Sequence, residues 1–197
     1  GALAVFSVGV LAQLGSEGKI RFMHAVPGAP EIDVYVGGEL TATMLDFGEA
    51  TGYINVPAGN QTVTVTVAGL ATVLWEQDVD VADSPLLLLA SDPDSPQFAV
   101  FPESLEPLAP GTTRFAVVHA IAGGPAVQVV ADGDPVGASL AYGEYLGTFD
   151  VPSAVFELSG EAEGTIVVPP MPTGLISSTA QTLVVYGTSD VPESLLL

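Results

Sequence analysis

The stretch Ile32-Asp33-Val34-Tyr35-Val36-Gly37-Gly38 alternates aliphatic side chains with Asp33 and Tyr35 and ends in a glycine pair. A period of two is typical of a β-strand with one buried face, and a glycine pair is a common hairpin turn. The pattern therefore predicts a strand over 32–36 that turns back into a second strand over 40–45.

Neighbouring segments extend this pattern. Residues 61–67 place their Val side chains on one face and their Thr side chains on the other, which predicts a half-buried strand. The run over 75–81 places Trp75, Val79 and Val81 among acidic partners. The continuous apolar run over 86–89 is typical of a central strand. No segment keeps a helical period, and strands separated by Gly and Pro turns indicate an all-β sandwich.

The sequence also repeats itself. His24-Ala25 recurs 95 residues later as His119-Ala120. At the same spacing the matching pairs are Gly28 and Gly123, Pro30 and Pro125, Val34 and Val129, Gly38 and Gly133, Leu45 and Leu140, Gly52 and Gly147, and Val56-Pro57 and Val151-Pro152. Pro102-Glu103-Ser104-Leu105 recurs after only 90 residues as Pro192-Glu193-Ser194-Leu195, which predicts a five-residue deletion after Pro152 in the second copy.

The repeat predicts two tandem immunoglobulin-like β-sandwich modules, the first over 19–109 and the second over 112–197. Residues 1–18 belong to neither copy and form a separate N-terminal strand and linker. Because 48% of the residues are hydrophobic, a chain of this length can bury a sizeable core.

Charge and composition exclude several classes of partner. The chain has 197 residues, with three Lys and Arg against 23 Asp and Glu, which gives a net charge of −20. Nucleic acids and anionic membranes are bound largely through basic side chains, so neither is an expected partner. The absence of Cys removes disulfides, thiolate catalysis and zinc–thiolate sites.

The stretch from Arg21 to Gly38, followed by Phe47-Gly48-Glu49 and Val56-Pro57-Ala58-Gly59, resembles the family catalogued as domain of unknown function 4397. Members of that family carry a strand ending in His-Ala-Ser-Pro, then Ala-Pro, a Val-Asp-Val-Tyr strand and a later Pro-Ala-Gly turn. The resemblance covers nearly all of 19–197. It implies tandem domains of a secreted or surface protein of bacteria or archaea, and it brings no established reaction.

The second module departs from the family pattern at two places. Gln128 stands where the first module has Asp33, and Ser153-Ala154 stands where it has Ala58-Gly59. Asp33 itself is expected to lie on the strand surface rather than to act as a catalytic carboxylate.

Ala2 to Leu14 forms a run of 13 residues without a charge. A helix that spans a bilayer needs about 20 residues, so no membrane span is predicted here. Taken as a strand, the run has one wholly apolar face, and its anchors are Ala4, Phe6, Val8, Val10, Ala12 and Leu14. Such a strand has what insertion into a neighbouring subunit requires, although pairing with its own module or an origin as the apolar core of a signal peptide remains open.

The leading interpretation is a structural subunit of an extracellular, pilus-like filament, built head to tail by this donor strand after removal of a leader before Gly1. The partner would then be another copy of the same chain. The alternative is a cell-surface binding or adhesion module that recognises a glycan or a protein and keeps the strand in its own module. An enzyme is not expected.

The two histidines, His24 and His119, occupy the same repeat position, and we expect each to bond nearby backbone at a strand end rather than to catalyse a reaction. No Gly-x-Ser-x-Gly motif accompanies them. The only cofactor that the sequence suggests is Ca²⁺, for which Asp78, Asp80, Asp92 and Asp94 could supply oxygen ligands, although they lack the spacing of a known calcium loop. Acidic residues that alternate along a strand more often mark its solvated face, so no metal site is expected.

Overall fold

The first sandwich is formed by nine strands in two sheets of the computed structural model, which describes residues 16–82, 84–92, 94 and 98–197. One sheet has the order β4-β1-β8-β9, with β5 also paired to β1. The other has the order β3-β2-β6-β7. The strands are β1 (Glu17–His24), β2 (Ile32–Val36), β3 (Glu39–Leu45), β4 (Glu49–Ala50), β5 (Ile54–Pro57), β6 (Gly59–Val67), β7 (Val73–Val81), β8 (Leu86–Ala90) and β9 (Phe98–Pro102).

The second sandwich repeats this arrangement with eight strands. Its sheets have the orders β13-β10-β16-β17 and β12-β11-β14-β15. The strands are β10 (Thr112–His119), β11 (Val127–Ala131), β12 (Asp134–Leu140), β13 (Tyr145–Pro152), β14 (Val155–Ala162), β15 (Thr165–Gly174), β16 (Ala180–Gly187) and β17 (Pro192–Leu196). The predicted all-β sandwich class is confirmed, and the described residues contain no helix that could cross a bilayer.

Local patterns place the strands as predicted. The alternating stretch at 32–36 is β2, and it turns at Gly37-Gly38 into β3. On β6, Val63 and Val65 are fully buried, because they occupy the face that packs on the opposite sheet. The run at 86–90 is β8, which lies between β1 and β9 and is buried along its whole length.

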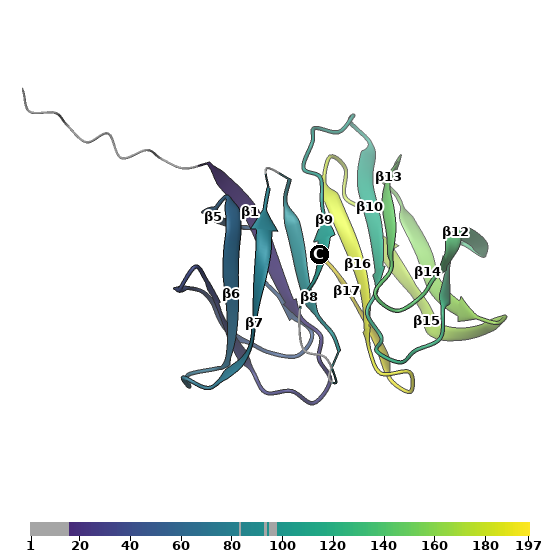
Figure 1. The fold of residues 1–197 in the computed structure, drawn as a ribbon. Coiled ribbons are helices and arrows are strands. Elements are labelled where there is room, and N and C mark those ends of the chain that lie inside the picture. The colour runs from purple at the N-terminus through teal and green to yellow at the C-terminus, as the bar shows by residue number, and fades with distance from the viewer. Residues whose placement is uncertain (1–15, 83, 93, 95–97) are drawn as a thin grey trace, which may run out of the picture.

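Three hydrophobic cores hold the molecule together. Each sandwich has its own core between its two sheets. The third core lies between the sandwiches and includes Met23, Leu89 and Phe101 from the first and Val118 and Tyr186 from the second. The sheets that carry β1 and β10 therefore face each other, and we call them the inner sheets; the two sandwiches stand side by side with β9 near β16 (Figure 1).

Two sequence expectations were wrong, and the first is the five-residue deletion after Pro152. Leu89 pairs with Met23 and Val184 with Val118, so the offset of 95 still holds at β8 and β16. Pro102 pairs with Leu86 at the end of β9, whereas Pro192 pairs with Gly187 at the start of β17. The two Pro-Glu-Ser-Leu segments therefore occupy different structural positions, and their spacing does not measure a deletion.

The second correction concerns Asp33, which is not on the surface. Its side chain is 7% exposed, and its carboxylate accepts hydrogen bonds from the backbone N–H of Met44 at 2.8 Å and of Gly69 at 2.9 Å. Met44 has a positive φ of 49°, an uncommon conformation for a residue other than glycine. Asp33 thus fixes an irregular turn of β3 by satisfying buried backbone donors.

The predicted donor strand, with anchors Ala4, Phe6, Val8, Val10, Ala12 and Leu14, lies outside the described residues. The first described residue, Ser16, accepts a hydrogen bond from Ala58 N at 2.8 Å, and β1 begins at Glu17 opposite Pro57.

Candidate functional site

The contact between the inner sheets is built twice from the same repeat positions. At one end, the ring of Phe47 lies edge-on to Tyr186, with centroids 5.5 Å apart. At the other end stand Tyr142, which is 95 residues after Phe47, and Ser91, which is 95 residues before Tyr186; their hydroxyl oxygens are 3.0 Å apart. At both ends the same two repeat positions meet, with the two sandwiches in exchanged roles, and this exchange is typical of packing about a two-fold axis.

The two ends differ in how they are filled. A Cβ added to Gly48 would lie 2.7 Å from the hydroxyl of Tyr186, whereas a Cβ on the matching Gly143 would meet no atom within 4 Å. Ser91 is too small to occupy the space that the phenol ring of Tyr186 takes at the other end. The result is a cavity of about 290 Å³, which we call the interface pocket.

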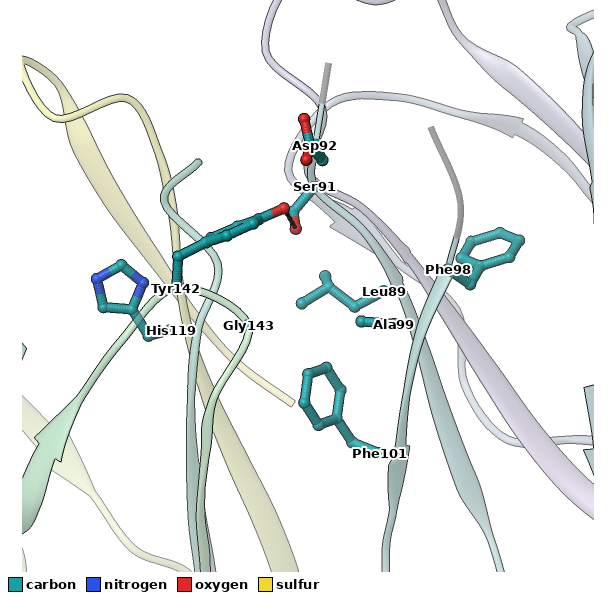
Figure 2. Close-up of a pocket in the computed structure, with 9 residues that line it drawn as sticks. All are labelled: Leu89, Ser91, Asp92, Phe98, Ala99, Phe101, His119, Tyr142 and Gly143. Carbon is teal, nitrogen blue, oxygen red and sulfur yellow. Dashed lines mark hydrogen bonds between the residues drawn. The ribbon is translucent and has the colours of Figure 1, made fainter. Parts of the chain in front are cut away.

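Figure 2 shows the side chains around the interface pocket, which come from both sandwiches. The first contributes Leu89, Ser91, Asp92, Phe98, Ala99 and Phe101, and the second contributes His119, Tyr142 and Gly143. Gly143 is exposed and Asp92 is half-buried, so the pocket reaches solvent beside these two residues.

The ring of Phe101 forms one wall of the pocket, and Phe98 lies on the opposite face of the same strand, β9, with its ring pointing away from the pocket (Figure 2). Phe98 is 3% exposed and anchors β9 in the core of the first sandwich, where it packs against Phe22 and Trp75 with ring centroids 5.6 and 5.7 Å away. Phe101 packs against Tyr145 of the second sandwich at 5.9 Å. Because these rings are held from behind, the pocket is largely pre-formed, and a ligand would not have to order them.

Polar groups face the rings across the pocket. The phenol of Tyr142 is placed by its own loop, where Gly143 N donates to His119 O at 2.9 Å. Burial raises the pKa of Tyr142, the bond to Ser91 lowers it and the charge of Asp92 raises it again, so the net shift is upward and the group stays a neutral hydroxyl near pH 7. Ser91 and Tyr142 thus supply hydroxyls, and Asp92 supplies a carboxylate.

Ser91, Asp92 and His119 have the residue types of a hydrolytic triad, but the side chains are not arranged as one. Nε2 of His119 lies 3.0 Å from the carbonyl oxygen of Pro125, and its Nδ1 is buried without a hydrogen-bond partner in the described part of the chain. Ser91 contacts the Tyr142 hydroxyl instead, and the Tyr142 ring extends between His119 and Ser91 (Figure 2). A base that activates the serine must reach its hydroxyl, and His119 does not.

His24 repeats the backbone contact of His119 in the first sandwich. Its Nε2 lies 3.2 Å from the carbonyl oxygen of Pro30, and its carbonyl accepts from Gly48 N at 2.7 Å. Burial lowers the pKa of both imidazoles, partly offset by these carbonyl contacts. Each histidine sits at a strand end and fixes the loops that carry Phe47 or Tyr142.

A buried ion pair links the two inner sheets, and the sequence did not predict it. The guanidinium of Arg21 binds both carboxylate oxygens of Glu103, and these oxygens also accept from Tyr53 at 2.8 Å and from Thr182 of the second sandwich at 2.7 Å. Burial, together with the Glu103 charge and despite the Arg21 charge, raises the pKa of Tyr53 far above its usual value. Arg114 at the surface makes a bidentate pair with Asp150.

The calcium candidates do not meet in one site. Asp78 and Asp80 are exposed on β7, where Asp78 accepts from the Thr62 hydroxyl at 2.8 Å. Asp92 lies by the interface pocket and accepts from Asp94 N at 2.9 Å. Among the residues that the structure describes, no group of three His, Cys, Asp or Glu side chains could hold a metal ion.

Comparison with known proteins gives one family. The model described as "Domain of unknown function (DUF4397)" matches residues 18–123, which span the first sandwich and β10. Residues 124–197 lie outside the match, and they carry the departures at Gln128 and Ser153-Ala154. No curated protein matches the chain.

Two solved structures share low similarity with the chain. One is CBMbc, a family CBM26 module from Eubacterium rectale Amy13K in complex with maltoheptaose, with a TM-score of 0.29, 11% identity and coverage of 90% of this chain and 96% of that chain. The other is a "putative cell adhesion protein" from Bacteroides fragilis NCTC 9343, with a TM-score of 0.26, 9% identity and coverage of 90% and 97%. At these TM-scores the likeness carries no functional argument.

Proposed function

The chain belongs to the family of domains of unknown function DUF4397, and from its interface pocket we propose that it is an extracellular binding module of the cell surface that holds a neutral saccharide. The single observation that carries the proposal is the unfilled end of the sandwich interface, where Ser91 stands at the repeat position of Tyr186.

The shape of the pocket supports a small ligand or the end of a longer one. Its volume of about 290 Å³ lies just below the usual range for ligand sites, which begins at about 300 Å³. Fixed rings on one side and a few polar groups on the other are the usual design of such sites, because the rings give affinity and the polar groups give orientation.

The chemistry of the lining supports a neutral, polyhydroxylated ligand. The hydroxyls of Ser91 and Tyr142 can donate or accept, and the carboxylate of Asp92 accepts from ligand hydroxyls. The rings of Phe101 and Tyr142 offer flat apolar surfaces for the carbon face of a sugar ring. A net charge of −20 disfavours phosphate, sulfate and other anionic ligands.

Binding rather than catalysis fits the arrangement of the same residues. The serine hydroxyl bonds Tyr142, and the histidine bonds the backbone, so the pocket offers recognition groups without an activated nucleophile. The fold supplies the rigid scaffold that such a module needs, since the pocket residues lie on or beside strands of both inner sheets.

The test is a glycan array probed with the whole chain, followed by calorimetric titration of the saccharides it selects. Ser91→Tyr should abolish binding, because the new ring fills the pocket as Tyr186 fills the opposite end. Tyr186→Ser is the matched control at the other end of the interface and should leave binding in place; Tyr186→Phe serves the same purpose if that variant is unstable.

Three results would reject the proposal. They are an array without any bound saccharide, equal affinity of the native protein and the Ser91→Tyr variant, and an affinity that falls steeply with salt. The last result would identify a charged ligand, because only interactions between charges are screened in this way.

A further inference from the structure

A second cavity lies at the side of the second sandwich, between the edge strands β12 and β13. Its volume is about 230 Å³, and every side chain that lines it is apolar. The side chains used below are Val136 from β12, Phe149 and Val151 from β13, and Phe156 and Leu158 from β14. Here the core of the sandwich is open at its flank, and we call this opening the apolar cleft.

The first sandwich has a cleft at the equivalent flank, but its lining is different. That cleft has a volume of about 390 Å³ and includes Glu39, Thr41, Asn55 and Gln61. At the repeat spacing of 95, Val136 replaces Thr41 and Phe156 replaces Gln61. The same framework therefore carries a polar cleft in one sandwich and an apolar cleft in the other. Apolar surface that is exposed at only one of two equivalent places indicates a candidate interaction site.

One strand that flanks the apolar cleft, β13, has an open edge past its first residues, where Gly137 of β12 packs against Leu146. In the described part of the chain, β12 pairs only with β11, and β13 pairs only with β10. The outer backbone groups of β13 beyond Leu146, beside Phe149 and Val151, thus remain available for a further strand. An open edge beside an apolar cleft is the arrangement that strand addition uses, with backbone hydrogen bonds along the edge and alternate side chains in the cleft.

We propose that the occupant is residues 4–14 of another copy of this chain. The side chains at its even positions are all apolar, so one face of an extended segment matches a lining without polar groups. Eleven extended residues span about 35 Å, more than enough to run along the open part of the β13 edge. The segment has no charge, so its insertion adds none to subunits that already carry −20 each.

The position of the first described residues, which follow the segment in the sequence, favours another copy over the same chain. Ser16 and Glu17 lie beside Pro57 and Ala58 in the first sandwich, and Pro57 borders the polar cleft. The apolar cleft is in the second sandwich. A contact from the first sandwich of one copy to the second of the next is heterologous and repeats head to tail, which yields a filament or a closed ring.

The test compares the mass of the native chain by light scattering and its appearance by negative-stain electron microscopy with those of two variants. The donor variant is Phe6→Asp with Val8→Asp, which places charges on the apolar face. The acceptor variant is Val136→Thr with Phe156→Gln, which gives the apolar cleft the residues of the first sandwich. Because the first sandwich folds around these residues, the acceptor variant should fold, and circular dichroism checks that it does.

Native chains should form filaments or rings, and each variant alone should be a monomer. A mixture of the two variants should stop at a pair of twice the 20.0 kDa monomer mass, because one functional donor and one functional cleft remain. Ser7→Asp, on the opposite face of the segment, is the matched control and should assemble like the native chain.

Monomeric native protein would overturn the proposal, as would assembly that survives in the acceptor variant or a mixture that gives no pair. Loss of assembly in the donor variant alone would place the segment in another groove, including that of its own first sandwich. The inference does not rest on saccharide binding, since the acceptor variant leaves the interface pocket intact, so either proposal can fail without the other.

Discussion

The two sandwiches share one framework and differ in a few side chains that decide what each can do. Both place a histidine at the end of β1 or β10, and both pair that strand in parallel with β8 or β16. They differ where Ser91 faces Tyr142 while Tyr186 faces Phe47, and where Arg21 is matched by Ala116. The comparison teaches that the two copies share their framework positions, whereas the open end of the interface, the buried ion pair and the apolar cleft each occur at one of two equivalent places.

The largest expected effect comes from breaking the ion pair that only the first sandwich has. Glu103→Ala leaves the buried Arg21 without its carboxylate, and losing one partner of a buried pair typically costs about 3–5 kcal/mol. Urea denaturation should show this loss in the free energy of unfolding. Asp150→Ala, which removes the surface partner of Arg114, is the control and should change stability little. Equal losses in the two variants would contradict the account.

The next effect separates the two ends of the interface. Tyr186→Ser should lower the free energy of unfolding by about 3 kcal/mol, because it removes a ring that is packed on Phe47 and opens a cavity. Ser91→Tyr adds the same ring where a cavity exists, and its stability should stay within about 1 kcal/mol of the native protein. Losses of similar size at both ends would mean that the interface pocket is not open space.

A smaller effect concerns the residues that brace β3 and β12. Asp33→Ala leaves the N–H groups of Met44 and Gly69 unpaired, and we expect a loss of about 2 kcal/mol in thermal or urea unfolding. Gln128, at the matching position, is half-buried and donates to the carbonyl oxygens of Val136 and Gly137. Gln128→Ala should lower the free energy of unfolding by less than Asp33→Ala does. A larger loss in Gln128→Ala would contradict the stronger structural role given to Asp33.

The smallest expected effect is a dependence of stability on pH that both sandwiches share. The folded state holds the pKa of His24 and His119 below 6.5, so the unfolded chain binds protons first as the pH falls. Stability from these groups is complete above pH 6.5 and decreases as the pH drops below it toward the folded pKa values. Replacing both histidines by Gln should weaken the pH dependence of the urea unfolding midpoint between pH 7.5 and 5.5. An unchanged slope would place the pH dependence in other groups.

Much of the fold follows from local patterns. Alternation over 32–36 and 61–67 and the apolar run at 86–89 each predict a strand that the structure contains, and the glycine pair at 37–38 predicts the turn between β2 and β3. The parallel pairs β1·β8 and β10·β16 could not be predicted, since their partners are separated by more than 50 residues and no local pattern encodes the pairing.

The interface pocket does not follow from local sequence patterns, because it depends on how the two sandwiches pack against each other. Ser91 and Tyr142 lie far apart in the sequence and in different copies. The signal was present in the repeat, where Tyr186 matches Ser91 at a spacing of 95. Aligning the Pro-Glu-Ser-Leu segments at 90 instead places Gln181 against Ser91 and hides the difference.

The most direct test of the central claim is a protein-observed NMR titration with a saccharide selected on the array. The account predicts shifts of the amide signals of Ser91, Asp92, Tyr142 and Gly143 at the open end of the interface. It predicts unchanged signals for Phe47, Gly48 and Tyr186 at the filled end. Shifts confined to other loops, or equal shifts at both ends, would contradict the claim that Ser91 leaves one end of a repeated interface open for a ligand.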